Sequence, residues 1–291
     1  MELRILRSFL AVAQEQSISG AARVLHITQP SLSRQIMELE EEVGGKLFER
    51  GNRKITLTEQ GILLHKRAGQ IMELVQKTRE EMASTGEDTS GVIHIGAGET
   101  QAFRVIATSL KELMEQYPCI HFHLYSGNSE DVMERLAKGL LDFGLFIEPH
   151  DVTKYNYLRL PLADRWGVLM RKDSPLAALD AIRAEDLWSV PLISSRQALE
   201  GGQLSSWLKI APEKLRLVGT YNLLFNASLM VEAGAGYALC LDGIVNIHEK
   251  SNLCFRPLAP ALTSYIDIVW KKNQIFSRPS EFLLAKLREY V

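Results

Sequence analysis

Apolar positions near the start of the chain recur at helical spacing and are interrupted by short polar segments. The apolar residues between positions 18 and 25 lie on one face of a predicted helix, which Ser17 or Ser19 can cap. His26-Ile27 breaks this pattern, and Thr28 can cap a second helix. Pro30 falls in the first turn of that helix, where its missing N–H is not needed. The pattern predicts two short helices joined by a tight turn.

The second of these helices combines an apolar stripe with a polar tip. The stripe is formed by Leu32, Ile36, Leu39 and Val43. The polar residues near the start of the helix lie largely off the stripe and are Gln29, Ser31, Ser33, Arg34 and Gln35. Gln and Arg can make bidentate contacts to base edges, and Ser can contact a base or a phosphate. The pattern favours a recognition helix for the DNA major groove, and its alternative is an ordinary helical hairpin with a solvated polar face.

The residues that follow favour DNA binding over the plain hairpin. Segments 47–50 and 54–57 read as short strands on either side of a turn at Gly51-Asn52. Arg50, Arg53 and Lys54 then gather at or near the tip of this hairpin, as a basic wing that can grip phosphate or reach the adjacent minor groove. The far end of the helix carries acidic residues that DNA would repel, namely Glu38, Glu40, Glu41 and Glu42.

This region also resembles a known family. The run AARVLHITQPSLSRQIMELEEEVGGKLFER, followed by ITLTEQG, is similar to the DNA-binding domain of LysR-type transcriptional regulators. The match is long, gapless and N-terminal, as in that family. On this basis we expect a set of side chains in the major groove, with the basic wing beside it. That set is Gln29, Pro30, Ser31, Ser33 and Arg34.

Two further helices are expected around this motif. The first carries Leu3, Leu6, Leu10 and Ala13, with Phe9 beside them, and should pack on the helix pair. The second begins after Thr58, runs to about Ser84, and has a seam with steps of three and four. Its seam residues are Leu64, Ala68, Ile71, Val75, Thr78 and Met82. The seam and the resemblance both indicate a dimerisation helix, and the alternative is a helix packed on its own domain.

Beyond a polar linker at 85–90 the pattern changes to alternating strands and helices, which predicts an α/β fold with a parallel, doubly wound sheet. A second α/β lobe follows from about residue 161, and the C-terminal residues return to the first lobe. This part resembles the two-lobed, periplasmic-binding-protein-like (type II) effector domain of LysR-type regulators, most clearly at VEAGAGYAL. The expected division is 1–58 for the winged helix-turn-helix, 59–90 for the dimerisation helix and hinge, and 91–291 for the effector domain. Within it, lobe I covers about 91–160 and 266–291, and lobe II about 161–265.

Small ligands in such folds bind at strand ends near helix N-termini, where free amides favour an anion such as a carboxylate. Segments 194–196 and 221–222 of the second lobe can face this position. Glu99 complicates it, because an acidic side chain weakens an anion site or favours an amine-bearing effector. By the resemblance, the expected effector-binding residues are Thr100, Gln101, Gly127, Asn128 and Phe146.

Composition narrows the alternatives. The 291 residues suggest two domains, and 46% hydrophobic with 23% charged residues is typical of a soluble globular chain. A net charge of −2 still allows one face to bind DNA. Cys119, Cys240 and Cys254 are scattered, and with no secretion signal expected, a reducing cytoplasm is the simplest location.

No metal site, cofactor or catalytic set is expected. The first rival is an enzyme or a solute-binding protein on the same fold, and the lack of a catalytic set and of a secretion signal speaks against it. An architectural DNA-binding protein is the second. We expect a regulator that forms a homodimer or homotetramer and binds double-stranded DNA and a small-molecule effector. Its effector, its operator and the choice between activation and repression stay open.

Overall fold

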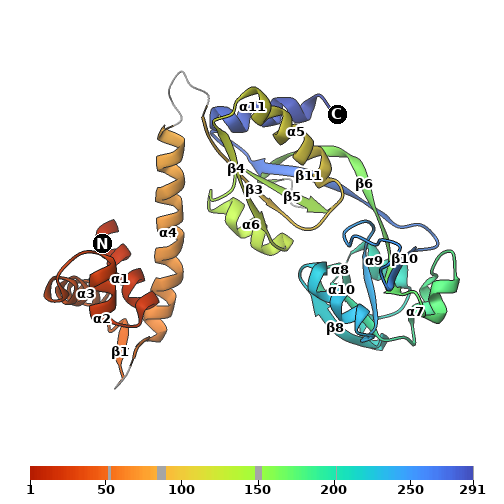
Figure 1. Cartoon of the computed structure of the whole chain (residues 1–291), viewed down its shortest axis with the longest axis horizontal. Coiled ribbons are helices and arrows are strands. Elements are labelled where there is room, and N and C mark those ends of the chain that lie inside the picture. Colours follow the sequence, from red (N-terminus) through yellow and green to blue (C-terminus); the bar gives the residue numbers. More distant parts are fainter. Residues whose placement is uncertain (52–53, 84–89, 148–152, 201, 291) are drawn as a thin grey trace. The chain divides into compact units, whose positions relative to one another are not determined.

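The computed structural model describes residues 1–51, 54–83, 90–147, 153–200 and 202–290. The chain forms two compact units, Met1–Met82 and Ala83–Val291. The N-terminal unit contains α1 (Leu3–Glu15), α2 (Ile18–Val24), α3 (Gln29–Val43), β1 (Phe48–Arg50), β2 (Ile55–Leu57) and the long helix α4 (Glu59–Ala83) (Figure 1).

The helix starts follow the local signals in the sequence. Ser17 Oγ accepts a hydrogen bond from the Gly20 amide at 3.1 Å, so Ser17 rather than Ser19 caps α2. Thr28 caps α3 by accepting from the Ser31 amide at 3.4 Å. His26, in the turn between the two helices, has a φ of 54° in the left-handed region, which ends α2 sharply. The expected helix–turn–helix and hairpin are confirmed.

The apolar faces of this unit are turned slightly from those expected. In α1 the buried face is formed by Ile5, Leu6, Phe9 and Val12, and the expected Leu3 is 44% exposed. In α3 the stripe is buried at Leu32, Ile36 and Leu39 but not at Val43, which is 38% exposed at the helix end.

Helix α4 packs on its own unit along the first half of the expected seam. Ala68 is fully buried in the N-terminal core, and Leu64 and Ile71 pack against that core. At these three positions the helix packs on its own domain, which is the alternative to dimerisation considered above. Among the exposed apolar side chains of α4, Ile62, Leu63 and Leu74 lie off the seam, and Met82 is the last residue of the seam.

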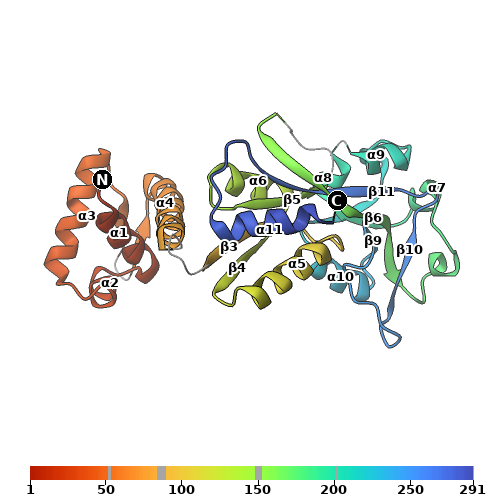
Figure 2. The ribbon, with the colours of Figure 1, turned by 90° about the horizontal axis from the view of Figure 1, so that it is seen from above.

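Lobe I of the C-terminal unit is built on the parallel strands β4 (Ile120–Ser126), β3 (Gly91–Ala97) and β5 (Phe143–Ile147), in that spatial order. Helices α5 (Phe103–Gln116) and α11 (Arg278–Arg288) pack side by side on one face of this sheet (Figure 2). Helix α6 (Ser129–Ala137) packs on the other face through Val132 and Leu136. The strand–helix alternation in the sequence predicts this parallel arrangement.

Lobe II has a mixed sheet in which β7 (Leu192–Ser195) pairs in parallel with β8 (Leu217–Tyr221) and β9 (Tyr237–Leu241). Its remaining elements are the short helices α7 (Ala184–Leu187), α8 (Arg196–Leu199) and α9 (Gln203–Leu208), helix α10 (Leu224–Glu232), strand β10 (Leu253–Pro257), and 3-10 turns at Pro175–Ala178 and Pro212–Lys214. Two apolar clusters cover opposite sides of this sheet, and α10 packs into one of them.

Two long strands connect the lobes. Strand β6 (Tyr155–Arg171) and strand β11 (Thr263–Lys271) pair antiparallel, with Thr263 opposite Arg165 and Lys271 opposite Tyr155. Their lobe I ends continue the sheet beyond β5, and residues Trp166–Leu169 of β6 pair with β9 in lobe II. Both strands run from one lobe into the other in Figure 1. The sheet order β4-β3-β5-β11-β6-β9-β7-β8 therefore passes through both lobes.

Candidate functional site

The first turn of α3 presents polar side chains to solvent. Gln29, Pro30, Ser31 and Arg34 are exposed, and Ser33 is half-buried. Arg34 Nε donates to Glu38 Oε1 at 2.9 Å, and the Arg34 side chain is 80% exposed. The buried stripe on the opposite side fixes this face outward, so its amide, hydroxyl and guanidinium groups are accessible to a large ligand.

Two polar residues of α3 have structural roles instead. Gln35 Oε1 accepts from Ser8 Oγ at 2.7 Å, which ties α3 to α1. Glu40 is only 9% exposed, and its carboxylate accepts from the Leu47 amide at 2.9 Å and from Lys46 Nζ at 2.7 Å. Burial alone would raise the pKa of Glu40, but these bonds and one from the Phe48 amide hold it below its usual value. Glu40 therefore anchors the hairpin to α3. Of the four acidic residues expected at this end of the helix, Glu40 is the one that is buried.

Of the three basic residues expected at the hairpin, Lys54 is the one whose side chain the structure describes. Lys54 is exposed just before β2, and its carbonyl accepts from the Gly51 amide at 3.0 Å. Arg50 ends β1, although its side chain is not described, and Arg53 lies outside the described residues. The hairpin base is fixed by Thr58, whose hydroxyl donates to the Lys46 carbonyl at 2.7 Å and accepts from the Gly61 amide at 3.0 Å.

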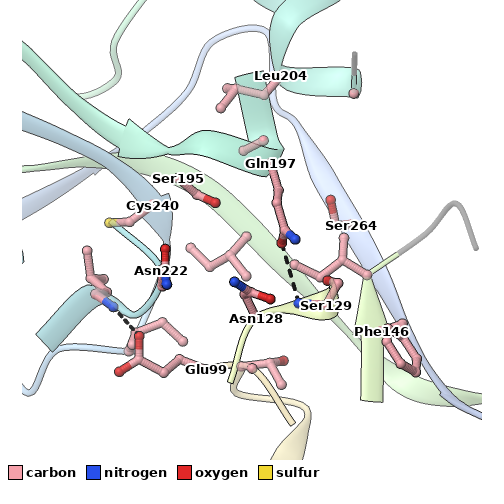
Figure 3. A pocket seen from close by; sticks show the side chains of 18 of the residues that line it. Glu99, Asn128, Ser129, Phe146, Ser195, Gln197, Leu204, Asn222, Cys240 and Ser264 are labelled. Carbon is pink, nitrogen blue, oxygen red and sulfur yellow. Dashed lines mark hydrogen bonds between the residues drawn. The ribbon is translucent and has the colours of Figure 1, made fainter. Parts of the chain in front are cut away.

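A cavity of about 420 Å³ lies between the two lobes of the C-terminal unit. Side chains from both lobes surround it in Figure 3, with Glu99, Asn128 and Phe146 from lobe I and Ser195, Gln197 and Leu204 from lobe II. The crossing strands add Trp166, Ser264 and Ile266. A cavity of this size and mixed lining suits a small organic molecule.

Hydrogen bonds span the two lobes beside this cavity. The Glu99 carboxylate accepts from the Leu224 amide at the start of α10, and the Gln101 side-chain amide donates to the Gly243 carbonyl. The Ser129 amide at the start of α6 donates to Gln197 Oε1 at 3.4 Å (Figure 3). Each bond joins an element of lobe I to an element of lobe II.

Buried titratable groups lie beneath and beside the cavity. Burial raises the pKa of the Asp164 carboxyl, against hydrogen bonds from Thr100 Oγ1, at 2.5 Å, and from the amides of Gln101 and Ala102. Burial likewise raises the pKa of the Cys240 thiol to about 12, so that this cavity-lining thiol is protonated at neutral pH.

Neither a membrane span nor a metal centre emerges from the described part of the chain. None of its helices has the length and apolarity needed to cross a bilayer. Within the same residues, no group of three or more His, Cys, Asp or Glu side chains is placed to hold a metal ion.

Comparison with known proteins identifies both units. Residues 3–62 match the family described as bacterial regulatory helix-turn-helix protein, lysR family, and residues 86–291 match the LysR substrate binding domain. The chain belongs to the LysR family. It is therefore a DNA-binding transcriptional regulator with a substrate-binding effector domain.

Named relatives and solved structures agree with this assignment. The LysR-family chain is 29% identical to the transcriptional regulator BudR of Raoultella terrigena, over 97% of this chain and 99% of the relative. It is 29% identical to the transcriptional activator IlvY of Salmonella typhimurium, over 82% of each. Its fold is similar to full-length CbnR crystallised with its target DNA, with a TM-score of 0.78, 19% identity and 100% of both chains covered.

The cavity includes most, but not all, of the residues expected from the sequence of this LysR-family protein. Thr100, Gly127 and Asn128 line it, whereas Gln101 lies outside the lining and reaches across to lobe II. Phe146 borders the cavity, but the residue is only 3% exposed and packs in a lobe I core cluster.

From the expected second-lobe segments, Ser195, Tyr221 and Asn222 line the cavity, whereas Ser194 and Arg196 do not. Sequence reasoning also missed several lining residues, among them Gln197, Glu200, Leu204, Trp166 and Ser264. The first three follow β7 in a stretch whose local pattern carries no ligand signal, and the other two lie inside long strands.

Proposed function

We propose that α3 of this regulator enters the major groove through Gln29, Pro30, Ser31, Ser33 and Arg34. The observation that carries this proposal is the exposure of Gln29, Ser31 and Arg34 in the first two turns of α3, where Leu32 and Ile36 are buried. Arg50, Arg53 and Lys54 are proposed to contact phosphate or the adjacent minor groove. The domain division proposed with it is 1–58, 59–90 and 91–291.

We further propose that the chain acts as a homodimer, or as a homotetramer built from dimers, through α4. The exposed Ile62, Leu63, Leu74 and Met82 support this, because a second copy of the helix can cover them. A two-fold dimer offers two copies of α3 to a roughly palindromic site. The cytoplasm is the proposed location, since the DNA target lies there.

The cavity between the lobes is the proposed effector site, with Thr100, Gly127 and Asn128 as contacts and the backbone around Phe146 at its edge. Gln101 is proposed to act on the lobe arrangement through Gly243 rather than on the ligand. An effector bound here alters the angle between lobes or between subunits, and thereby the spacing or bend of the promoter DNA. It shifts this equilibrium only by its differential affinity for the two arrangements.

DNA binding is tested by selecting genomic fragments with the full-length protein and measuring affinities by fluorescence anisotropy. Arg34→Ala should weaken binding to a selected fragment by about 1–3 kcal/mol and leave random DNA largely unaffected, if Arg34 reads a base. Arg216→Ala, which removes an exposed cation from the other unit, is the matched control. Equal loss on both DNAs makes Arg34 a phosphate contact, and no loss on either removes α3 from the interface.

A further inference from the structure

The charge around the interlobe cavity is one-sided. Among the described residues that line the cavity, the charged side chains are Glu99 and Glu200, and no Lys, Arg or His is present. Glu200 lies 3.8 Å from Arg196 Nε, so its charge is partly balanced at the surface. Glu99 is half-buried and forms no ion pair within the described part of the chain.

Glu99 already holds the nearest helix N-terminus. Its Oε2 accepts from the Leu224 amide at the start of α10, and Figure 3 shows this bond at the edge of the cavity. A helix N-terminus supplies about half a positive charge, which offsets only part of a full carboxylate charge. The Glu99 field therefore remains negative, and it acts on the neighbouring Tyr221 and Cys240, whose pKa values it helps to raise.

Two other helix starts at the cavity, those of α5 and α6, are also occupied by acceptors of the chain itself. At α5, the Ala102 amide donates to Thr100 Oγ1 at 3.0 Å, and the Thr100 hydroxyl donates to the Asp164 carboxylate. At α6, the Asp131 amide donates to Asn128 Oδ1 at 2.9 Å, and the Ser129 amide donates to Gln197. These amides are thus already used, so the expectation of an anionic effector finds no support at α5, at α6 or at the Leu224 amide of α10.

We infer that the effector of this regulator carries a cationic group, such as a protonated amine, which pairs with Glu99. Its apolar body contacts the aliphatic side chains of the cavity, including Leu204, Leu224 and Ile244. A compact cavity lined by one sign of charge concentrates ligands of the opposite sign. This inference rests on the proposed role of the cavity as the effector site and adds the chemical class of the ligand.

The charge of the cavity is measured first, without an effector. In a full-length Cys119→Ser background, which removes the exposed thiol, Asn222→Cys places a reactive thiol in the lining. We measure the rates at which this thiol reacts with two methanethiosulfonate reagents, one carrying a trimethylammonium group and one a sulfonate. The cation-to-anion rate ratio is then divided by the same ratio for free 2-mercaptoethanol. At low salt we expect a preference for the cation of about tenfold, reduced severalfold by Glu99→Gln.

Two controls make this measurement decisive. Glu112→Gln removes a carboxylate that pairs with Lys286 and does not line the cavity, and it should leave the ratio unchanged. Ser195→Cys is a second reporter in the lining, for use if Asn222→Cys does not fold. A normalised ratio near one, a preference for the anion, or no response to Glu99→Gln overturns the inference.

Ligand binding is then compared with molecules matched in size. Thermal stabilisation of the full-length protein is measured with 2-phenylethylamine, 2-phenylethanol and phenylacetate, and with a metabolite collection covering all three charge classes. Stabilisation by amines that Glu99→Gln abolishes supports the inference. Stabilisation mainly by carboxylates or by neutral molecules overturns it and leaves the proposed effector site intact. If no member of any class stabilises the protein, the proposed effector site fails, and the inference fails with it.

Discussion

Replacing Glu40 by alanine should unfold the N-terminal unit more readily, because this carboxylate links α3 to the hairpin. It accepts from the Leu47 amide at 2.9 Å and from Lys46 Nζ at 2.7 Å, with the Glu40 side chain 10% exposed and that of Lys46 76% exposed. A hydrogen bond to a charged acceptor contributes about 1.5–3 kcal/mol. The exposed ion pair with Lys46 adds at most about 1 kcal/mol. We therefore expect a loss of about 2–3 kcal/mol, most of it from the unpaired Leu47 amide.

Amide hydrogen exchange in the intact protein reports this loss for the N-terminal unit alone. The most protected amides of α1 and α3 should exchange about 30–150-fold faster in Glu40→Ala, while those of the C-terminal unit are unchanged. Glu38→Ala is the matched control, since Glu38 forms an exposed ion pair with Arg34, and its loss should cost less than about 0.5 kcal/mol. Equal effects of the two substitutions would refute the anchoring role of Glu40.

The pH dependence of the same variant gives an independent check. The folded-state pKa of Glu40 lies below its usual value, so the unfolded chain takes up this proton first as the pH falls. The stabilisation is fully present above the unfolded-state pKa and is lost as the pH falls through the folded-state pKa. The difference between the natural protein and Glu40→Ala should therefore shrink in acid, and a difference that grows there would contradict the assignment.

Three further predictions concern single side chains. Ser264→Ala should lower stability by about 1–3 kcal/mol in thermal or urea unfolding, because Trp166 Nε1 donates to Ser264 Oγ at 2.9 Å in a buried position and would lose its acceptor. Ser17→Ala should cost about 1 kcal/mol through loss of the α2 cap, and the corresponding Ser→Gly change only a few tenths, as measured by exchange of the α2 amides. In the native protein at pH 8, iodoacetamide should label the exposed Cys119 and spare Cys240, whose pKa of about 12 leaves little thiolate, and mass spectrometry of the labelled peptides reads this out.

Local signals predict the parts of this fold that depend on neighbouring residues. The caps at Ser17 and Thr28 are set within three residues of the helix starts, and the alternation of strands and helices after the linker predicts the parallel strands β3, β4 and β5. Apolar spacing likewise predicts the buried positions of α3 except at its C-terminal end, where Val43 is exposed. These features need no knowledge of what packs against the element.

Features that depend on distant segments are those that the sequence does not predict. The burial of Glu40 is set by the amides after the helix, which a helical charge pattern cannot indicate. The apolar seam of α4 has the same spacing whether it faces a second chain or its own core, and Leu64, Ala68 and Ile71 face the core. At the cavity, Gln101 contacts Gly243, which lies 142 residues later in the chain, only because the fold brings lobe II against lobe I.

The interlobe bonds support the proposed action of an effector on the two lobes. Glu99 and Gln101 stand on one short segment of lobe I, and their partners, the Leu224 amide and the Gly243 carbonyl, belong to separate parts of lobe II. A cation that pairs with Glu99 competes with the Leu224 amide for the same carboxylate and so weakens one of these two links. The effector then has different affinities for linked and unlinked lobes, which is the requirement for shifting their populations. Full conversion between 1:99 and 99:1 would need a difference of about 10⁴-fold, so one altered link is expected to produce a graded shift.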